Sequence, residues 1–308
     1  MFTAKKRRLA VFGVVAIGAM VALTGCSNSN PLKSGSTSGA SGDTIVIGSQ
    51  QYYSDTIVAE AYAQALENGG FKVKRQFNIG QRSVYLPQLA KGQIDLIPDY
   101  SGNLLQFYDA KTTAKSEADI EAALPGVLPK GLRVLKAAPA KDEDTYTVTK
   151  EFSQKNNITS LAELKNYKGS LVVGANAEFQ TRLYGIPGLK SVYGVTATLK
   201  AIADSGGPLT VAALKNNTVQ LADIYSADPA IKANDFVSLS DPENMILPQQ
   251  IIPVADKKVT SKAAAIIDKV NAALTQKELI DLNSQSVNQK QSAAVIATAF
   301  LKSAGLVK

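Results

Sequence analysis

Two segments more than a hundred residues apart share one pattern, and this repeat constrains the fold more than any other feature. The first is Ile94-Asp95-Leu96-Ile97-Pro98-Asp99-Tyr100-Ser101, and the second is Val219-Gln220-Leu221-Ala222-Asp223-Ile224-Tyr225-Ser226. Each is a short apolar run that follows a polar turn and a helix-compatible segment, and each ends in Tyr-Ser. Because ligands bind beyond the carboxyl ends of strands in open α/β sheets, the repeat predicts one tyrosine at a strand end in each half of a two-lobed protein. Chance similarity between two helix–strand units is the alternative.

The rest of the sequence alternates strands and helices in the same way. Strands are expected at 44–49, 71–79 and 171–174, and helices at 55–68, 83–91, 178–184, 210–216 and through much of 260–308. This alternation predicts an α/β fold with largely parallel sheets. Two extended segments, 145–150 and 251–254, are expected to be hinge strands, with the chain crossing near Thr147 and returning near Ile251. Residues 43–146 then form the first lobe, 147–250 the second, and 251–308 complete the first, which makes a clamp that can close around a ligand.

The N-terminus has the pattern of a bacterial lipoprotein signal. The basic run Lys5-Lys6-Arg7-Arg8 precedes an apolar run from Leu9 to Leu23, and Leu23-Thr24-Gly25-Cys26 follows. The pattern implies that residues 1–25 are a signal peptide, cleaved before Cys26, whose thiol is lipidated. A retained membrane helix is the weaker alternative, because about 20 apolar residues are needed to cross a bilayer. The Ser- and Gly-rich residues 26–42 are expected to form a flexible tether that holds the protein at the extracytoplasmic face of the membrane.

Composition excludes several classes of function. The chain has no His and no Trp, and Cys26 is its only cysteine, so Ser-His-Asp and Cys-His catalysis and His- or Cys-based metal sites are excluded. Of the net charge of +7, the signal contributes four positive charges and leaves +3, too little for a nucleic-acid-binding face. No glycine-rich phosphate-binding loop follows a strand. No catalytic residue, cofactor or metal is therefore expected, although a carboxylate pair acting in an enzyme stays open as the weaker interpretation.

The segment from Ala90 to Gly102 resembles the most specific motif of a known family, the substrate-binding proteins of ABC importers for glycine betaine, choline, carnitine and related osmoprotectants. Supporting matches are 144–150, 178–182 and 223–229, in the order and spacing that the family shows. The resemblance implies a two-lobed fold of the type II periplasmic-binding-protein kind. It also implies that the protein is not an enzyme. It also implies a quaternary amine as ligand, an ABC permease with its ATPase as partner, and a monomer anchored to the membrane by lipid.

The resemblance also implies which residues bind the ligand. A trimethylammonium group has no N–H to donate and is held instead by aromatic faces, each worth roughly 0.5–2 kcal/mol. Tyr100, Tyr146 and Tyr225 match the family's cage tyrosines, and Arg182 matches its carboxylate-binding arginine. Two further matches are Asp144 beside the cage and Asn103 near the ligand. The alternatives are ordinary: a tyrosine at a strand end can be a core residue, and an arginine can be solvated.

Two positions depart from the family pattern. Gln50 stands where relatives commonly have a lysine, and Gln249 lies in a Pro-Gln-Gln segment where they have Pro-Tyr. Tyr52 or Tyr53 could supply the missing aromatic wall, in which case a quaternary amine remains the ligand. Alternatively, the two glutamines belong to a pocket rebuilt for another small polar ligand. A lipid-anchored enzyme using Asp or Glu, and a sensor or adhesion lipoprotein, are the other rivals.

Overall fold

The computed structural model of the chain describes residues 44–308. The expected signal peptide (1–25), the expected lipidation site Cys26 and the expected tether (26–42) lie outside the described residues. Within residues 44–308, no helix has both the length and the apolar character needed to cross a membrane.

The first of two five-stranded sheets has the order β2-β1-β3-β10-β4. The parallel strands β1 (Ile45–Gly48), β2 (Val73–Gln76) and β3 (Leu96–Tyr100) come from the beginning of the chain. Strand β10 (Ile251–Ala255) pairs antiparallel with β3, and the short β4 (Arg133–Val134) pairs with β10. Strands β3 and β10 are buried along their whole length; β10 is apolar throughout, and β3 is apolar except for Asp99 and the hydroxyl of Tyr100.

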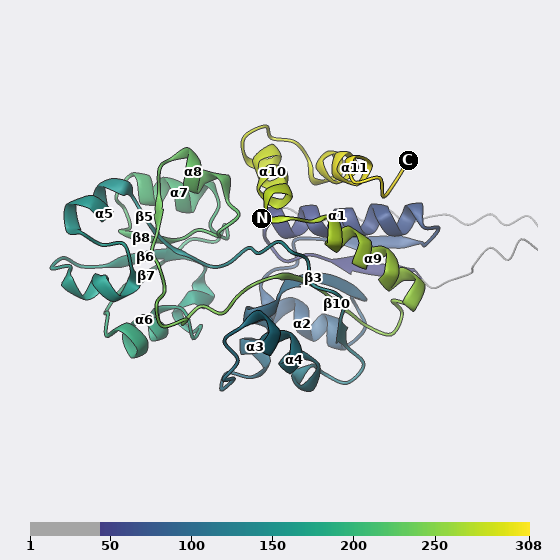
Figure 1. Ribbon diagram of the computed structural model, residues 1–308, viewed down its shortest axis with the longest axis horizontal. Coiled ribbons are helices and arrows are strands. Elements are labelled where there is room, and N and C mark those ends of the chain that lie inside the picture. Colours follow the sequence, from purple (N-terminus) through teal and green to yellow (C-terminus); the bar gives the residue numbers. More distant parts are fainter. Residues whose placement is uncertain (1–43) are drawn as a thin grey trace, which may run out of the picture. The chain divides into compact units, whose positions relative to one another are not determined.

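The second sheet has the equivalent order, β7-β6-β8-β5-β9. Here β6 (Val172–Ala175) is parallel to β7 (Thr198–Ala201) and β8 (Leu221–Asp223), whereas β5 (Tyr146–Val148) is antiparallel to both β8 and β9 (Val237–Ser238). The two segments of the sequence repeat therefore hold the same place: β3 and β8 are each the central strand of a sheet. The structure is an α/β fold with two lobes, one around each sheet (Figure 1).

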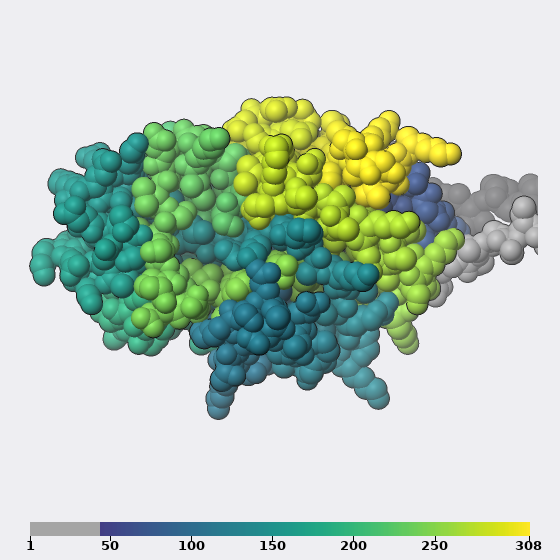
Figure 2. Space-filling view, viewed as in Figure 1, coloured from purple at the N-terminus to yellow at the C-terminus, as the bar shows by residue number. Residues whose placement is uncertain are grey.

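Helices cover both faces of the first sheet (Figure 1). One side carries α1 (Tyr53–Asn68), α9 (Ser261–Ala273), α10 (Gln276–Val287) and α11 (Ala293–Ser303); the other carries α2 (Arg82–Ala90), α3 (Ser101–Tyr108) and α4 (Glu117–Val127). Helices α9, α10 and α11 each begin at a Thr or Ser side chain that accepts a backbone N–H of the first turn, which satisfies one of the free donors there. Helix α1 packs against α11, so the first and last helices of residues 44–308 lie side by side (Figures 1 and 2).

The second lobe has shorter helices around its sheet. They are α5 (Lys150–Asn156), α6 (Ile186–Tyr193), α7 (Pro208–Lys215), α8 (Pro229–Ala233) and the 3₁₀ helices η1 (Leu161–Asn166) and η2 (Ala177–Gln180). The continuous helix start that we expected at 178–184 is wrong. The backbone N–H groups of Thr181 and Gly185 donate to the carbonyl oxygens three residues earlier, so this segment is a series of tight turns.

The chain crosses between the lobes earlier than we expected. Tyr146, Thr147 and Val148 all pair inside the second sheet, so the crossing lies before β5, in residues 135–145, and a boundary between 146 and 147 cuts the strand. The return crossing occupies residues 239–250, before β10. A β-rich composition indicates a strand but not the sheet to which it pairs, which explains the error. The two crossing segments meet in an isolated antiparallel bridge between Lys141 and Gln250.

Candidate functional site

A small cavity lies where the ends of β3 and β8 meet the two crossing segments. We call it the inner cavity, and its lining residues are Gln50, Arg82, Tyr100, Asn103, Asp142, Asp144, Arg182, Tyr225 and Gln249. Its volume is about 10 Å³, which is space for about one water. An organic ligand can therefore enter only if these side chains move apart.

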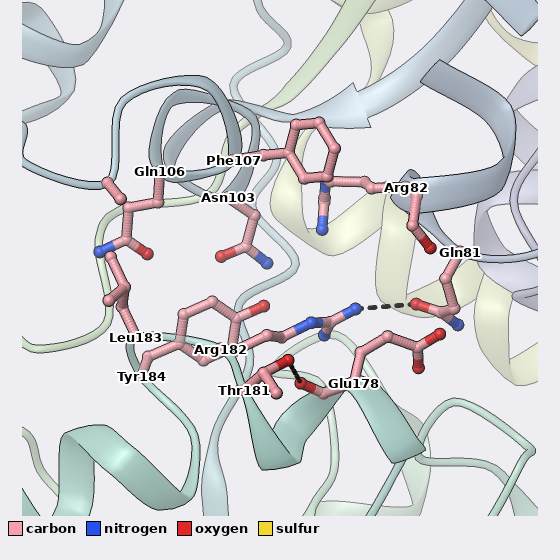
Figure 3. A pocket seen from close by; sticks show the side chains of 12 residues that line it. Gln81, Arg82, Asn103, Gln106, Phe107, Glu178, Thr181, Arg182, Leu183 and Tyr184 are labelled. Carbon is pink, nitrogen blue, oxygen red and sulfur yellow. Dashed lines mark hydrogen bonds between the residues drawn. The ribbon is translucent and has the colours of Figure 1, made fainter. Parts of the chain in front are cut away.

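A larger pocket of about 310 Å³ adjoins it (Figure 3). The two spaces share Arg82, Asn103 and Arg182, so these three side chains stand between them. We call this larger space the outer pocket. Phe107 and Leu183 line it and are 46% and 43% exposed. The outer pocket thus offers apolar surface next to a polar interior.

Arg82 is held by a buried carboxylate. Its Nε and Nη2 lie 3.0 Å and 2.7 Å from Asp99 Oδ1, and the Tyr85 hydroxyl donates to Asp99 Oδ2 at 2.8 Å. Both members of the ion pair are buried. Breaking such a pair leaves an uncompensated charge, so Arg82 has a structural partner even though it faces the cavity.

Arg182 extends between the lobes. Its Nη2 donates to Gln81 Oε1 at 2.8 Å, as Figure 3 shows, and its Nη1 lies 3.7 Å from Asp144 Oδ1. The guanidinium carbon is 5.7 Å from the centre of the Tyr184 ring. The contact between Arg182 Nη1 and Asp144 Oδ1 is an ion pair without a hydrogen bond. Arg182 Nη1 is therefore still available to an anionic group.

Of the three tyrosines predicted to form a cage, two lie at the inner cavity. Tyr100 is the last residue of β3, and Tyr225 follows β8. Tyr146 lies elsewhere: it is 1% exposed, its hydroxyl donates to the Tyr184 carbonyl oxygen at 2.7 Å, and its ring contacts Phe179 in the core of the second lobe. The structure therefore gives Tyr146 the position of a core residue.

Tyr52 and Tyr53, the suggested replacements for a missing aromatic wall, lie behind Tyr225. The Tyr52 ring meets the Tyr225 ring edge-on with centres 4.7 Å apart, and it meets the Tyr53 ring at 4.9 Å. Their hydroxyls donate at 2.8 Å to Asp142 Oδ2 and Asp228 Oδ2, respectively. These two tyrosines support Tyr225 and are not among the residues that line the inner cavity.

The two glutamines differ in how they are held. The Gln50 side-chain amide donates to Asp55 Oδ2 at 3.3 Å, and the Gln50 backbone N–H donates to Asp55 Oδ1 at 2.9 Å. Gln249 Oε1 accepts a hydrogen bond from Asn103 Nδ2 at 2.7 Å, and the same nitrogen donates to Asp144 Oδ2 at 2.6 Å. Asn103, Asp144 and Gln249 thus form one cluster, although they are far apart in the sequence.

Two carboxyl groups, those of Asp142 and Asp144, line the inner cavity together with two arginines, and Asp55 and Asp223 contact lining residues from outside it. Burial raises the pKa of Asp142 to about 7 and raises the pKa of Asp55 well above its usual range. Burial and the neighbouring Asp144 carboxyl raise the pKa of Asp223. The only arginines that line the cavity are Arg82 and Arg182. Burial thus favours the neutral form of these carboxyl groups, and a cation bound among them would favour their ionised form.

Sequence reasoning missed Arg82, Asp142 and Asp99 as residues of the site. Asp99 lies inside the matched motif, and Asp142 belongs to the acidic run that contains Asp144, so both had a local signal. Arg82 had none, because its position depends on how α2 packs against β3. Within residues 44–308, no cluster of three or more Asp, Glu, His or Cys side chains is arranged to hold a metal ion.

Comparisons with known proteins give a consistent result. The sequence model of the family described as the substrate-binding domain of ABC-type glycine betaine transport systems matches residues 43–303. The chain is 25% identical over 279 residues to the glycine betaine-binding protein YehZ of Escherichia coli, covering 86% of this chain and 92% of that protein. It is 24% identical over 310 residues to the carnitine transport binding protein OpuCC of Listeria monocytogenes, covering 97% of each.

Solved structures show the same fold. A glycine betaine/carnitine/choline ABC transporter protein superposes with a TM-score of 0.68 at 20% identity, covering 85% of this chain and 99% of that one. Lactococcal OpuAC, in its closed conformation with glycine betaine, superposes with a TM-score of 0.60 at 17% identity, covering 84% and 95%. These neighbours are two-lobed binding proteins. The chain therefore belongs to the OpuAC family, the substrate-binding domains of ABC-type glycine betaine transport systems.

Proposed function

We propose that this protein captures a small organic amine cation between its lobes and delivers it to an ABC permease that works with an ATPase. Quaternary amines such as glycine betaine, choline and carnitine are the first candidates, because relatives are named for glycine betaine and carnitine. The observation that carries the proposal is the inner cavity itself, which Tyr100 and Tyr225 line together with the buried carboxyl groups of Asp142 and Asp144. Aromatic faces and carboxylates both attract a cation.

The location of the protein is part of the same proposal. The lipoprotein pattern ending at Cys26 supports a lipid anchor at the extracytoplasmic face of a bacterial membrane, where the protein would act as a monomer. A solute-binding protein works beside its permease, and a tether of residues 26–42 keeps it there. Mass spectrometry of the membrane fraction tests this: a lipid-modified N-terminal Cys26 supports it, and an unprocessed Met1 contradicts it.

Thermal unfolding of the purified protein against a panel of amines tests the ligand class. A ligand at 100 times its dissociation constant stabilises the fold by about 2.7 kcal/mol, which is readily seen as a shift in the midpoint. We expect glycine betaine, choline or carnitine, or a close amine analogue, to raise the midpoint, while neutral sugars do not. A protein that unfolds cooperatively and responds to no amine contradicts the proposal. Recovery of a chemically altered ligand would instead favour an enzyme.

A further inference from the structure

Two hydrogen bonds join the lobes at positions outside the ligand site. The Ser205 hydroxyl donates to the Gln51 backbone carbonyl oxygen at 2.7 Å, and the Tyr53 hydroxyl donates to Asp228 Oδ2 at 2.8 Å. Gln51 and Tyr53 follow β1 in the first lobe, whereas Ser205 follows β7 and Asp228 follows β8 in the second. All four residues lie outside the linings of the inner cavity and the outer pocket. Both bonds must therefore break when the lobes separate.

Ser205 is held by its own lobe while it reaches across to the other. Its φ of +52° lies in the left-handed region, which a serine adopts only at a cost in stability. The Ser205 backbone N–H donates to Asn176 Oδ1 at 3.2 Å, and the Ser205 hydroxyl accepts from Asn176 Nδ2 at 3.3 Å. Ser205 is 3% exposed, so water competes little for its hydroxyl. The strained backbone thus presents a fixed donor to the first lobe.

The loop that carries Ser205 also touches the segment that carries Tyr225. A Cβ at Gly206 would lie 2.9 Å from the Asp223 carbonyl oxygen and 3.6 Å from the Tyr225 backbone nitrogen. The other end of the Ser205 bond lies one residue after Gln50, and both Gln50 and Tyr225 line the inner cavity. The Ser205 bond therefore ties together two segments that line the cavity, one from each lobe.

The bond from Tyr53 joins the first turn of one helix to the first turn of another. Tyr53 is the first residue of α1, and Asp228 caps α8. Asp228 Oδ1 accepts the Ala230 backbone N–H at 2.7 Å, which leaves Oδ2 for the Tyr53 hydroxyl. Asp228 is 6% exposed. The hydroxyl of Tyr53 therefore serves contact between the lobes, while its ring packs against Tyr52.

We propose that Ser205 and Tyr53 are positioning residues, which hold the lobes closed from outside the cavity and thereby set how long an amine stays bound. The inner cavity has space for about one water, so an amine enters and leaves only while the lobes are apart. An interaction made only in the closed state slows release without adding any contact to the amine. The effect on release rests on the proposed function, whereas the effect on closure does not.

Rates of binding test these roles. Stopped-flow titration uses whichever of glycine betaine, choline and carnitine gives the largest thermal shift. We expect Ser205→Ala and Tyr53→Phe each to raise koff about threefold or more, and the double variant about tenfold or more, because one net hydrogen bond is worth about such a factor. The association rate kon should stay within about twofold of the parent value, since the amine enters the open state.

Two matched variants separate lobe closure from general stability. Ser205→Gly also lacks the hydroxyl but relieves the left-handed strain, so it should release the amine as fast as Ser205→Ala while unfolding at a higher temperature. Tyr62→Phe removes a buried hydrogen bond to Asn271 inside the first lobe. It should lower the unfolding temperature and keep the koff of the parent.

The exposed side chain of Gln51 gives a third control. Gln51→Ala keeps the backbone carbonyl that Ser205 uses, so koff should be unchanged. Small-angle X-ray scattering of the unliganded proteins measures closure without any amine. The double variant should have a larger radius of gyration than the parent, because two bonds that favour closed lobes are missing.

The outcomes distinguish this inference from the proposed function. If an amine binds but the double variant keeps the koff of the parent, the inference is overturned and the proposed function stands. A rise in koff that is as large in Tyr62→Phe also overturns it, because release then follows general stability. If none of the three amines binds, the proposed function fails, and scattering alone decides: equal radii of gyration in parent and double variant overturn the inference as well.

Discussion

Two tyrosines that match the same family feature occupy different environments in this molecule. Tyr225 lines the inner cavity, whereas Tyr146 is buried in the second lobe with its hydroxyl on the Tyr184 carbonyl oxygen. Each lies in a segment that resembles the family pattern, Tyr146 in 144–150 and Tyr225 in 223–229. Tyr146 is the first residue of β5 and packs into the core of the second lobe, whereas Tyr225 lies beyond the end of β8.

This contrast gives a prediction for single substitutions. Tyr225→Ala and Tyr100→Ala should each weaken amine binding by about tenfold or more, because an aromatic face in contact with a desolvated cation is worth up to about 2 kcal/mol. Tyr146→Phe should leave affinity nearly unchanged while lowering the free energy of unfolding by about 1 kcal/mol, through the lost hydrogen bond. Calorimetry and urea unfolding measure the two effects separately. Equal losses of affinity in all three variants would contradict these roles.

Arg182 can be tested with two ligands that differ in charge. Its Nη1 has no hydrogen bond to Asp144, so a ligand carboxylate can still bind there. Arg182→Ala should therefore weaken the binding of glycine betaine by about tenfold more than the binding of choline, which has no carboxylate. Choline is the internal control for any change in fold. If both ligands lose the same affinity, Arg182 serves only to hold Gln81 and Asp144.

At the scale of elements, a glycine brings two segments of the chain together at the site. A Cβ at Gly102 would lie 2.5 Å from the Pro248 carbonyl oxygen and 2.7 Å from Leu247 Cβ. The Gly102 backbone N–H donates to the same carbonyl at 3.0 Å. This close approach places Gln249, in the return crossing, beside Asn103 in α3.

Gly102→Ala should consequently force α3 away from the return crossing. We expect a loss of about 1–3 kcal/mol in the free energy of unfolding, typical of overpacking, together with weaker ligand binding. Gly126→Ala in α4 is the matched control, because nothing lies within 4 Å of the added Cβ there. That control should be neutral or slightly stabilising, since alanine favours a helix. A tolerated Gly102→Ala with normal affinity would show that the close approach is not needed.

The elements that sequence predicted best are those with a local signal. The alternating strands and helices and the repeated Tyr-Ser strands follow from apolar spacing, and each repeat became the central strand of its sheet. The partners of Asn103 did not follow from sequence, because Asp144 and Gln249 lie on crossing segments whose course depends on long-range pairing. The crossing near Thr147 was misplaced for the same reason. Arg82 was missed because nothing in its neighbourhood distinguishes it from a solvated arginine.

At the scale of the whole molecule, the burial of carboxyl groups beside the inner cavity links folding and binding to pH. Burial raises the pKa of Asp142 to about 7, so the folded state holds this proton more tightly than the unfolded state does. Its contribution to stability is therefore complete below about pH 4 and is lost as the pH rises to about 7. For a shift of this size the loss is at most about 4 kcal/mol. Asp142 faces Tyr52, Asp144 and Asp228, and none of these supplies a compensating positive charge.

A bound cation should offset the cost of ionising the buried Asp142 carboxyl group. It favours the ionised form of Asp142, so affinity for an amine should rise between pH 6 and pH 8, and binding at pH 7 should release protons. Titrations in two buffers with different ionisation enthalpies measure that release directly. Asp142→Asn should abolish most of the pH dependence. Affinity that is constant across this range in the parent protein would contradict the prediction.

The packing of α1 against α11 also decides the order in which the two cores can be completed. The core of the second lobe draws its residues from a continuous stretch between Tyr146 and Ile246, whereas the core under α1 requires Phe300 and Leu301. During synthesis from the N-terminus, the second lobe has all its parts once residue 246 has left the ribosome. The core under α1, although Ile45 and Ile47 are made much earlier, is complete only after residue 301 has left the ribosome. The second lobe can therefore fold while the core under α1 is still incomplete.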